Sequence, residues 1–330
     1  MVYSGRSDPA ILGGSERPCD EGRSMLKRST RRLWREGRRA PGYSFVDFLH
    51  GYVYARWPYR YIGWAKGDRK IPLFLVPIVG LAAKLFLGKG AGRSAAAKRA
   101  FADHYHGKVV PTRAAEQLVT LDVDVELRGL EQVIPYATAQ DILLQEPDHI
   151  VVLECPCRAG VPNPCRPLDV CLIIGEPFAD FILEHHPAKS RRITQQEAVA
   201  ILRAERARGH VHHAFFKDAM LGRFYAICNC CSCCCGAMKA HRSGTPMLAP
   251  SGYLCEVEPE RCEGCGACAE ICPFDALSLE GGLARVAPDR CMGCGVCVAH
   301  CPQGALALVL APAKGEPLLV RRLAGRDEAL

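Results

Sequence analysis

The alternation of apolar and polar positions predicts two strands in the middle of the chain. Apolar side chains occupy positions 121, 123, 125 and 127, and carboxylates fill the positions between them, as expected for a half-buried strand over residues 121–127. Residues 149–153 are almost entirely apolar and predict a second, buried strand. A short helical pattern over residues 138–144 follows Pro135, so this stretch predicts a mixed α/β region.

The clearest helix is predicted over residues 194–208. Thr194 and Glu197 have the spacing of a capping box, and Gly209 is the residue type that commonly follows a helix C-terminus. Apolar side chains at positions 199, 201 and 202 give this helix one buried face.

The N-terminal third has a different pattern. Residues 1–40 are rich in arginine, glycine and serine and poor in apolar side chains, which predicts a disordered extension. Residues 41–104 contain many aromatic side chains and an apolar run over residues 71–88. The uncharged part of that run, residues 71–83, is shorter than the roughly 20 residues that a membrane-spanning helix needs. Residues 41–104 are therefore expected to contact a membrane surface, or to pack against the core or a partner protein.

Charge separates the same N-terminal region from the rest of the chain. Residues 1–110 carry 21 Lys and Arg against 8 Asp and Glu, a net charge of +13, whereas the remaining residues have a net charge of −6. A basic arm of this kind suits an anionic membrane surface, an acidic partner or nucleic acid. Nucleic-acid binding is not expected, because no sequence-reading motif accompanies the charge.

The most informative feature of the composition is the presence of 20 cysteines among 330 residues. Many lie two or three residues apart, at the spacing of metal ligands, and residues 1–40 lack the apolar stretch of a secretory signal peptide. Closely spaced thiols stay reduced and metal-loaded in a reducing compartment. A cytoplasmic protein is therefore expected, with a peripheral position at the inner membrane face as the alternative.

Eight of the cysteines form two quartets that repeat at an offset of 29 residues. The first quartet is Cys262, Cys265, Cys268 and Cys272, and the second is Cys291, Cys294, Cys297 and Cys301. A proline follows each quartet, and the match extends to residues on both sides, such as Val257 and Val286. A repeat that continues beyond the cysteines indicates a duplicated structural unit.

The spacing within each quartet predicts two [4Fe–4S] clusters. Three cysteines on a tightly wound loop face one iron–sulfur cube, and the fourth, before proline, reaches the other cube. The expected ligand sets are Cys262, Cys265, Cys268 and Cys301 for one cluster, and Cys291, Cys294, Cys297 and Cys272 for the other. Because each cluster would join both halves, this small domain is expected to fold largely on its metal.

Residues 253–310 resemble the bacterial-type dicluster ferredoxins, with all eight ligand positions matched. The resemblance implies a ferredoxin-like fold with a pseudo-two-fold repeat and electron transfer at low potential. Structural zinc in four-cysteine knuckles is the competing interpretation, which the duplication and the Cys-Pro endings disfavour.

Ten more cysteines lie upstream in two segments. They are Cys155, Cys157, Cys165 and Cys171 in the first segment, and Cys228, Cys230, Cys231, Cys233, Cys234 and Cys235 in the second. Thiolates suit one or two additional [4Fe–4S] clusters, which we favour, or zinc in a clasp between the segments. Three nearby histidines are expected to be surface or loop residues rather than ligands, because nothing pairs them at metal spacing: His210, His212 and His213.

The order of these segments is similar to that of a family of largely uncharacterised iron–sulfur proteins from anaerobic microbes. There a Cys-x-Cys-Arg segment, a helix that begins Thr-x-x-Glu and a Cys-Asn-Cys-Cys-x-Cys-Cys-Cys segment precede a dicluster domain, as they do here over residues 105–310. The resemblance implies cluster binding and electron transfer and supplies no substrate.

These observations predict an α+β protein with five parts. A basic extension (1–40) and an aromatic segment (41–104) precede a Cys-rich α/β domain (105–250), the dicluster domain (251–312) and a C-terminal tail (313–330). The expected function is electron transfer, as a ferredoxin-type carrier or a subunit that serves redox partner proteins. The alternatives are a reductase with a substrate-binding upstream cluster and a metal- or redox-sensing protein. No catalytic residue is identified, because the sequence contains no nucleophile–base pair and no nucleotide-binding motif.

Overall fold

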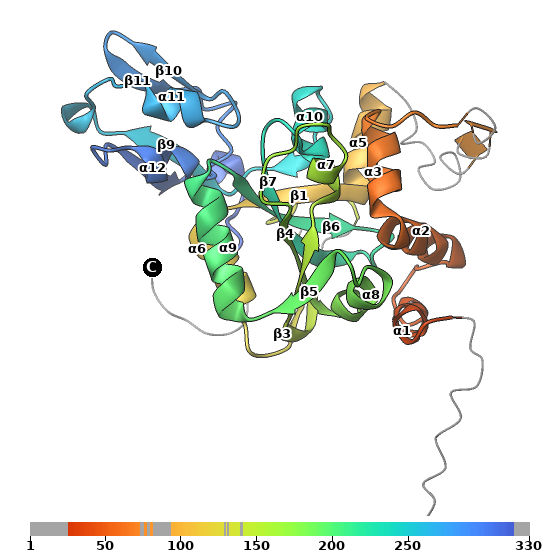
Figure 1. Ribbon diagram of the computed structural model, residues 1–330. Coiled ribbons are helices and arrows are strands. Elements are labelled where there is room, and N and C mark those ends of the chain that lie inside the picture. The colour runs from red at the N-terminus through yellow and green to blue at the C-terminus, as the bar shows by residue number, and fades with distance from the viewer. Residues whose placement is uncertain are drawn as a thin grey trace, which may run out of the picture.

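The computed structural model describes residues 26–72, 94–128 and 141–319, together with residues 76, 77, 80, 81, 130 and 132–138. Predictions for residues 1–25, for most of the apolar run 71–88 and for the end of the tail lie outside the described residues. The described part is a mixed α+β structure, as expected, with a central sheet and a smaller C-terminal module (Figure 1).

An eight-stranded sheet forms the centre of the Cys-rich part. Its strand order is β2-β3-β4-β7-β6-β1-β8, and β5 also pairs with β3. Neighbouring strands are antiparallel except for β1 and β8, which are parallel. The strands are β1 (Tyr105–Val110), β2 (Val125–Leu127), β3 (Ile142–Glu154), β4 (Asp169–Glu176), β5 (Ser190–Ile193), β6 (Val211–Lys217), β7 (Arg223–Cys230) and β8 (Leu248–Ala249).

Helices cover both faces of this sheet. Nearly every residue of β4, β6 and β7 is buried, which requires cover on both sides. In Figure 1, α6 and α9 lie together on one side, and α1, α2 and α8 gather on the other. The helices of this part are α1 (Arg28–Gly37), α2 (Phe45–Arg56), α3 (Pro58–Lys66), α5 (Ala95–His104), α6 (Thr112–Val119), α7 (Pro156–Ala159), α8 (Phe178–His185), α9 (Gln195–Ala207) and α10 (Gly236–Arg242).

Residues 28–37 form helix α1, so the prediction that residues 1–40 are disordered is wrong for this stretch. Leu33 is fully buried, and the Trp34 ring packs against Phe45 and Phe48 of α2 with 5.6 and 4.9 Å between ring centroids. Thr30 Oγ1 lies 2.9 Å from His185 Nε2, and the Ser29 amide donates to Glu184 over 3.0 Å, both on α8. Two apolar side chains and a few hydrogen bonds therefore fix a helix whose composition alone indicates disorder.

The aromatic segment packs into the core through α2 and α3, one of the alternatives expected for residues 41–104. A capping box between Ser44 and Asp47 starts α2. Tyr54 is buried, and the Tyr52 ring meets Phe181 edge to face with 5.9 Å between ring centroids. Among the described residues, no helix is long and apolar enough to cross a membrane.

The helix predicted over residues 138–144 is wrong. Ile142, Leu143 and Leu144 belong to β3, where Leu144 pairs with Val125 of β2. Ile142 and Leu144 are buried, so pairing with the neighbouring strand outweighs the local helical pattern. The strand predicted over residues 121–127 is shorter than expected, and the strand over residues 149–153 is confirmed within β3.

The helix predicted over residues 194–208 is confirmed as α9. The Thr194 side chain accepts a hydrogen bond from the Glu197 amide, and Gly209 has a φ of 79° just after the helix. The Glu197 carboxylate does not complete the predicted capping box but instead pairs with Arg191 at 2.5 Å.

The C-terminal module contains two short antiparallel strand pairs and two short helices. Strand β9 (Tyr253–Val257) pairs with β12 (Leu306–Leu310), and β10 (Leu277–Glu280) pairs with β11 (Leu283–Val286). Helices α11 (Ala267–Ile271) and α12 (Val296–His300) follow the two cysteine loops. Two further 3-10 turns are η3 (Pro259–Arg261) and η4 (Pro312–Lys314).

The module docks against the end of α9. His300 Nε2 lies 3.1 Å from the Ala207 carbonyl oxygen, and Ile271 packs so closely on Gly209 that a Cβ there would approach it to 2.6 Å. The His300 side chain is therefore a contact between the two parts of the chain.

We predict that His50 makes the folding stability depend on pH. Burial, with a contribution from Lys217, lowers the pKa of His50 to about 3, whereas an unfolded histidine titrates near 6.5. Only the unfolded chain then takes up this proton below pH 6.5, so stability is full above that pH and falls as the pH falls toward 3. Between pH 7.5 and 5.5, denaturant unfolding should show that wild type loses about 1 kcal/mol more than His50→Gln. An equal loss in both proteins would contradict the assignment.

Candidate functional site

The two cysteine quartets of the C-terminal module each surround one small cavity. The first cavity is lined by Cys262, Cys265 and Cys268 of one loop and by Cys301 of the other. The second cavity is lined by Cys291, Cys294 and Cys297, with Cys272 from the first loop. Each cavity thus receives its fourth thiol from the other half of the module, which is the arrangement that cubane clusters in this type of domain require.

Glycines let the backbone close around these cavities. Gly264 and Gly293 have φ values of 63° and 64°, and a Cβ on either would approach a carbonyl oxygen to 2.0 and 2.2 Å. Backbone amides also point at sulfur: Ala276 N lies 3.3 Å from Cys272 Sγ, and Ala305 N lies 3.3 Å from Cys301 Sγ. Such donors stabilise the thiolate form that binds iron.

The two cavities differ in exposure. In the first quartet Cys265 is exposed, whereas Cys291 and Cys297 of the second quartet are buried. Cys255, which has no partner in the sequence pattern, is buried beside the second cavity with its sulfur 3.5 Å from Cys297 Sγ. Strand β9 brings it there, and no spacing rule indicates this position.

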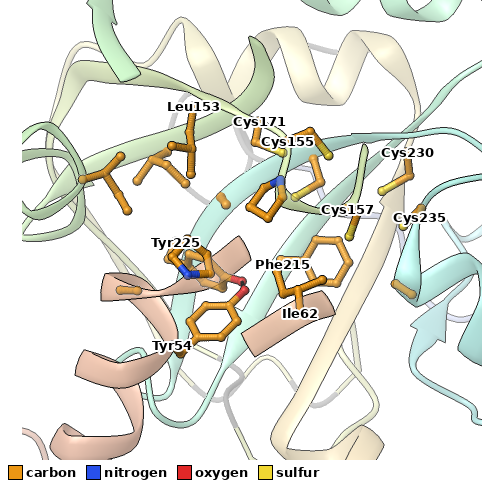
Figure 2. A pocket seen from close by; sticks show the side chains of 18 of the residues that line it. Tyr54, Ile62, Leu153, Cys155, Cys157, Cys171, Phe215, Tyr225, Cys230 and Cys235 are labelled. Atoms are coloured by element: carbon orange, nitrogen blue, oxygen red, sulfur yellow. Dashed lines mark hydrogen bonds between the residues drawn. The ribbon is translucent and has the colours of Figure 1, made fainter. Parts of the chain in front are cut away.

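Upstream, seven thiols line one chamber between the sheet and the helices α2 and α3. Cys231 lies at its edge, and the other six form its sulfur wall. Figure 2 shows several of them converging on this space. They come from four places: the start of α7, β4, β7 and the residue before α10. The six are Cys155, Cys157, Cys171, Cys228, Cys230 and Cys235.

Sheet register brings these segments together. Cys171 of β4 pairs directly with Cys228 of β7. The amide of Gly236, at the start of α10, points at Cys157 Sγ over 3.5 Å. The Cys235 thiol, assisted by His213, lowers the pKa of Cys230 to about 6. A thiol with that pKa is a thiolate at neutral pH and is ready to bind a metal.

The wall opposite the thiols is aromatic. Tyr54 Oη lies 2.8 Å from Tyr225 Oη and 3.4 Å from Tyr105 Oη. Burial raises the pKa of Tyr105 and Tyr225 well above the ordinary value, so the hydroxyls stay protonated. Phe178 and Phe215 complete this side of the chamber. The sulfur wall therefore faces an apolar wall that contains the cluster of tyrosine hydroxyls.

The other four upstream cysteines gather at the rim of the chamber. The sulfur atoms of Cys165, Cys231, Cys233 and Cys234 all lie within 4.8 Å of one another. Cys231 stands at the boundary, because it also lines the chamber. The structure thus places six of the ten upstream cysteines in the wall of the chamber and four in the rim group, with Cys231 shared between the two, an arrangement that the sequence does not predict.

Arg158, the arginine of the Cys-x-Cys-Arg segment, holds these loops together. Its guanidinium is buried and donates to the Pro167 carbonyl at 2.7 Å, the Glu205 carboxylate at 2.5 Å and the Asn229 carbonyl at 2.9 Å. Pro167 belongs to the loop that carries Cys165, Glu205 to α9, and Asn229 to the second cysteine segment. The pairing of Arg158 with Glu205 spans 47 residues, so no local sequence pattern indicates it.

The three histidines expected at the surface are buried instead. His212 and His213 lie on β6, and His210 directly precedes that strand. His212 Nδ1 lies 2.6 Å from the Asn229 side-chain oxygen, and burial lowers the pKa of His212 to about 4. The sequence does not predict this, because a central strand buried on both faces is recognisable only in the assembled sheet.

His213 lies at the chamber, and His241 of α10 lies at the C-terminal module. His213 is fully buried beside the Cys230 thiol. Burial, with a contribution from His213, lowers the pKa of His241. The His241 ring meets Phe274 edge to face with 6.2 Å between centroids. Phe274 lines the second cavity of the module, so His241 lies beside the second quartet.

We predict that Arg158→Met destabilises the protein by about 3–5 kcal/mol, because it removes the buried cation beside Glu205 and leaves that carboxylate with only His210 and the half-exposed Arg208 as partners. Anaerobic urea unfolding followed by circular dichroism measures this change. The control is Arg191→Met, since the Arg191–Glu197 pair is largely exposed and should contribute less than about 1 kcal/mol. Equal stability of the two variants would contradict the role of Arg158.

Comparison with known proteins addresses the C-terminal module. Residues 254–302 match a family model described as a 4Fe-4S dicluster domain. The comparison with curated proteins gives no match. The matched residues contain both cysteine loops and all eight cysteines of the two quartets. The C-terminal module of this chain is a 4Fe-4S dicluster domain.

Proposed function

We propose that this chain is an iron–sulfur electron-transfer protein in which the dicluster domain exchanges electrons with a third centre in the six-thiol chamber. A [4Fe–4S] cluster held by four thiolates accepts one electron, at a potential set by hydrogen bonds to sulfur and by solvent exposure. The eight cysteines of the dicluster domain are the proposed ligands of two such clusters, in the two sets that line the two cavities.

The observation that carries this proposal is the placement of two histidines between the chamber and the second quartet. His213 lies beside Cys230, and His241, whose pKa His213 helps to lower, contacts Phe274 of the second cavity. Redox centres that exchange electrons must be close, with protein rather than solvent between them, and these side chains favour that arrangement for the chamber and the more buried of the two quartets.

The difference in exposure supports a direction of exchange with partner proteins. The exposed Cys265 marks the first quartet as the approach for an external redox partner, such as an oxidoreductase subunit. Electrons would pass from there through the second quartet to the chamber, or in reverse. The equivalent glycine conformations, φ 63° at Gly264 and 64° at Gly293, support a pseudo-two-fold module that carries both clusters.

Substitution of one cysteine in the chamber and one in the first quartet tests the proposal. Cys157→Ser should lose about 4 iron atoms per chain and the upstream paramagnetic signal after dithionite reduction, and keep the signals of the dicluster domain. Cys265→Ser is the matched control and should have the opposite effect. Iron analysis and electron paramagnetic resonance of anaerobically purified protein measure both. If Cys157→Ser keeps all the iron of wild type, the chamber holds no iron centre.

A reductase is the second candidate, and the aromatic wall of the chamber favours it. The chamber offers six thiols where a cubane needs four, and protonated tyrosine hydroxyls stand opposite them. These hydroxyls could supply a proton to a substrate reduced at an open iron site. The second candidate predicts that carbon monoxide changes the paramagnetic signal that Cys157→Ser abolishes. If carbon monoxide does not change that signal, the reductase candidate is contradicted and electron transfer remains the proposed function.

A further inference from the structure

The rim quartet of Cys165, Cys231, Cys233 and Cys234 is far more compact than the other cysteine groups. Cys165 Sγ lies 3.1 Å from Cys233 Sγ, and Cys233 Sγ lies 3.3 Å from Cys234 Sγ. Over the described part of the chain, only one other group brings three or more His, Cys, Asp or Glu ligand atoms within 4.8 Å of one another. That group is His149, Glu176 and Asp180, where the His149 ring and the Glu176 carboxylate already pair at 2.6 Å.

The quartets of the dicluster domain provide an internal comparison. Neither of them, nor any three of the six chamber thiols, forms a group within that distance. A cubane spreads its four thiolates over four iron atoms, so its sulfur ligands are widely separated. A single tetrahedral zinc ion, with Zn–S bonds of about 2.3 Å, brings its four sulfurs to about 3.8 Å from one another. The rim quartet has the dimensions of a site for one ion.

The connections of the quartet indicate what such an ion would do. Cys165 comes from the loop between α7 and β4, and the other three come from the tight turn between β7 and α10. These segments carry Cys155, Cys157, Cys230 and Cys235 into the chamber. Arg242 donates to the Ser232 carbonyl and braces the same turn. A metal at the rim would therefore fasten together the two loops that form the sulfur wall.

We propose that these four cysteines bind one zinc ion in a closed, tetrahedral, structural site, separate from the iron centre in the chamber. Four protein thiolates leave no open position, and zinc neither changes oxidation state nor imposes a geometry of its own. The site goes beyond the proposed electron transfer and does not depend on it. The upstream cysteines would then bind both of the metals considered for them, zinc at the rim and an iron–sulfur cluster in the chamber.

Metal analysis of the anaerobically purified full chain tests the site. Wild type should contain about one zinc per chain, and Cys165→Ser and Cys233→Ser should retain less than about a fifth of it with their iron unchanged. Ser232→Ala, in the same turn, is the matched control and should keep its zinc. X-ray absorption at the zinc edge of wild type should show four sulfur neighbours at about 2.3 Å, a measurement that does not depend on folding of the variants.

Three results would overturn the proposal. One is a wild-type protein without zinc at this stoichiometry. Another is loss of iron rather than zinc from Cys165→Ser and Cys233→Ser, which would assign the quartet to a cluster. The third is a Cys165–Cys233 disulfide in protein alkylated under anaerobic conditions.

Discussion

The buried guanidinium of Arg158 is the contact on which the upstream cysteine centre depends. A charge removed from water is stable in the fold only when it is paired and its hydrogen bonds are satisfied. The two terminal nitrogens of Arg158 are paired with groups from the loop of Cys165, from α9 and from the second cysteine segment. The loops that carry the thiols have few apolar residues of their own, so this polar anchor fixes their relative positions.

The dicluster domain is stabilised in a different way. It is small, its strands are short, and the two cavities lined by sulfur occupy its centre. Metal binding and folding are coupled in such a domain. Its contacts with α9, through His300 and Ile271, orient the more buried quartet toward His241 and the chamber. The position of this domain therefore matters for function as much as its ligands do.

The sequence predicted most where the determining contacts are local. The cysteine loops of the dicluster domain and the cap of α9 are encoded within a few residues, and spacing alone identifies them. The chamber is different, because Cys171 meets Cys228 only through the order and register of the sheet. The same reason explains the buried His213, the role of Arg158 and the strand at Ile142, where long-range packing outweighs the local pattern. Helix α1 forms because Leu33 has a partner surface on α8, which composition cannot reveal.

The central claim is that iron occupies the chamber in addition to the dicluster domain. Mössbauer spectroscopy of protein produced with isotopically enriched iron, combined with total iron analysis, tests it most directly. The account predicts about 12 iron atoms or more per chain, with a cluster component in excess of two cubanes. A total of about 8 iron atoms, all in two equivalent cubanes, would contradict it.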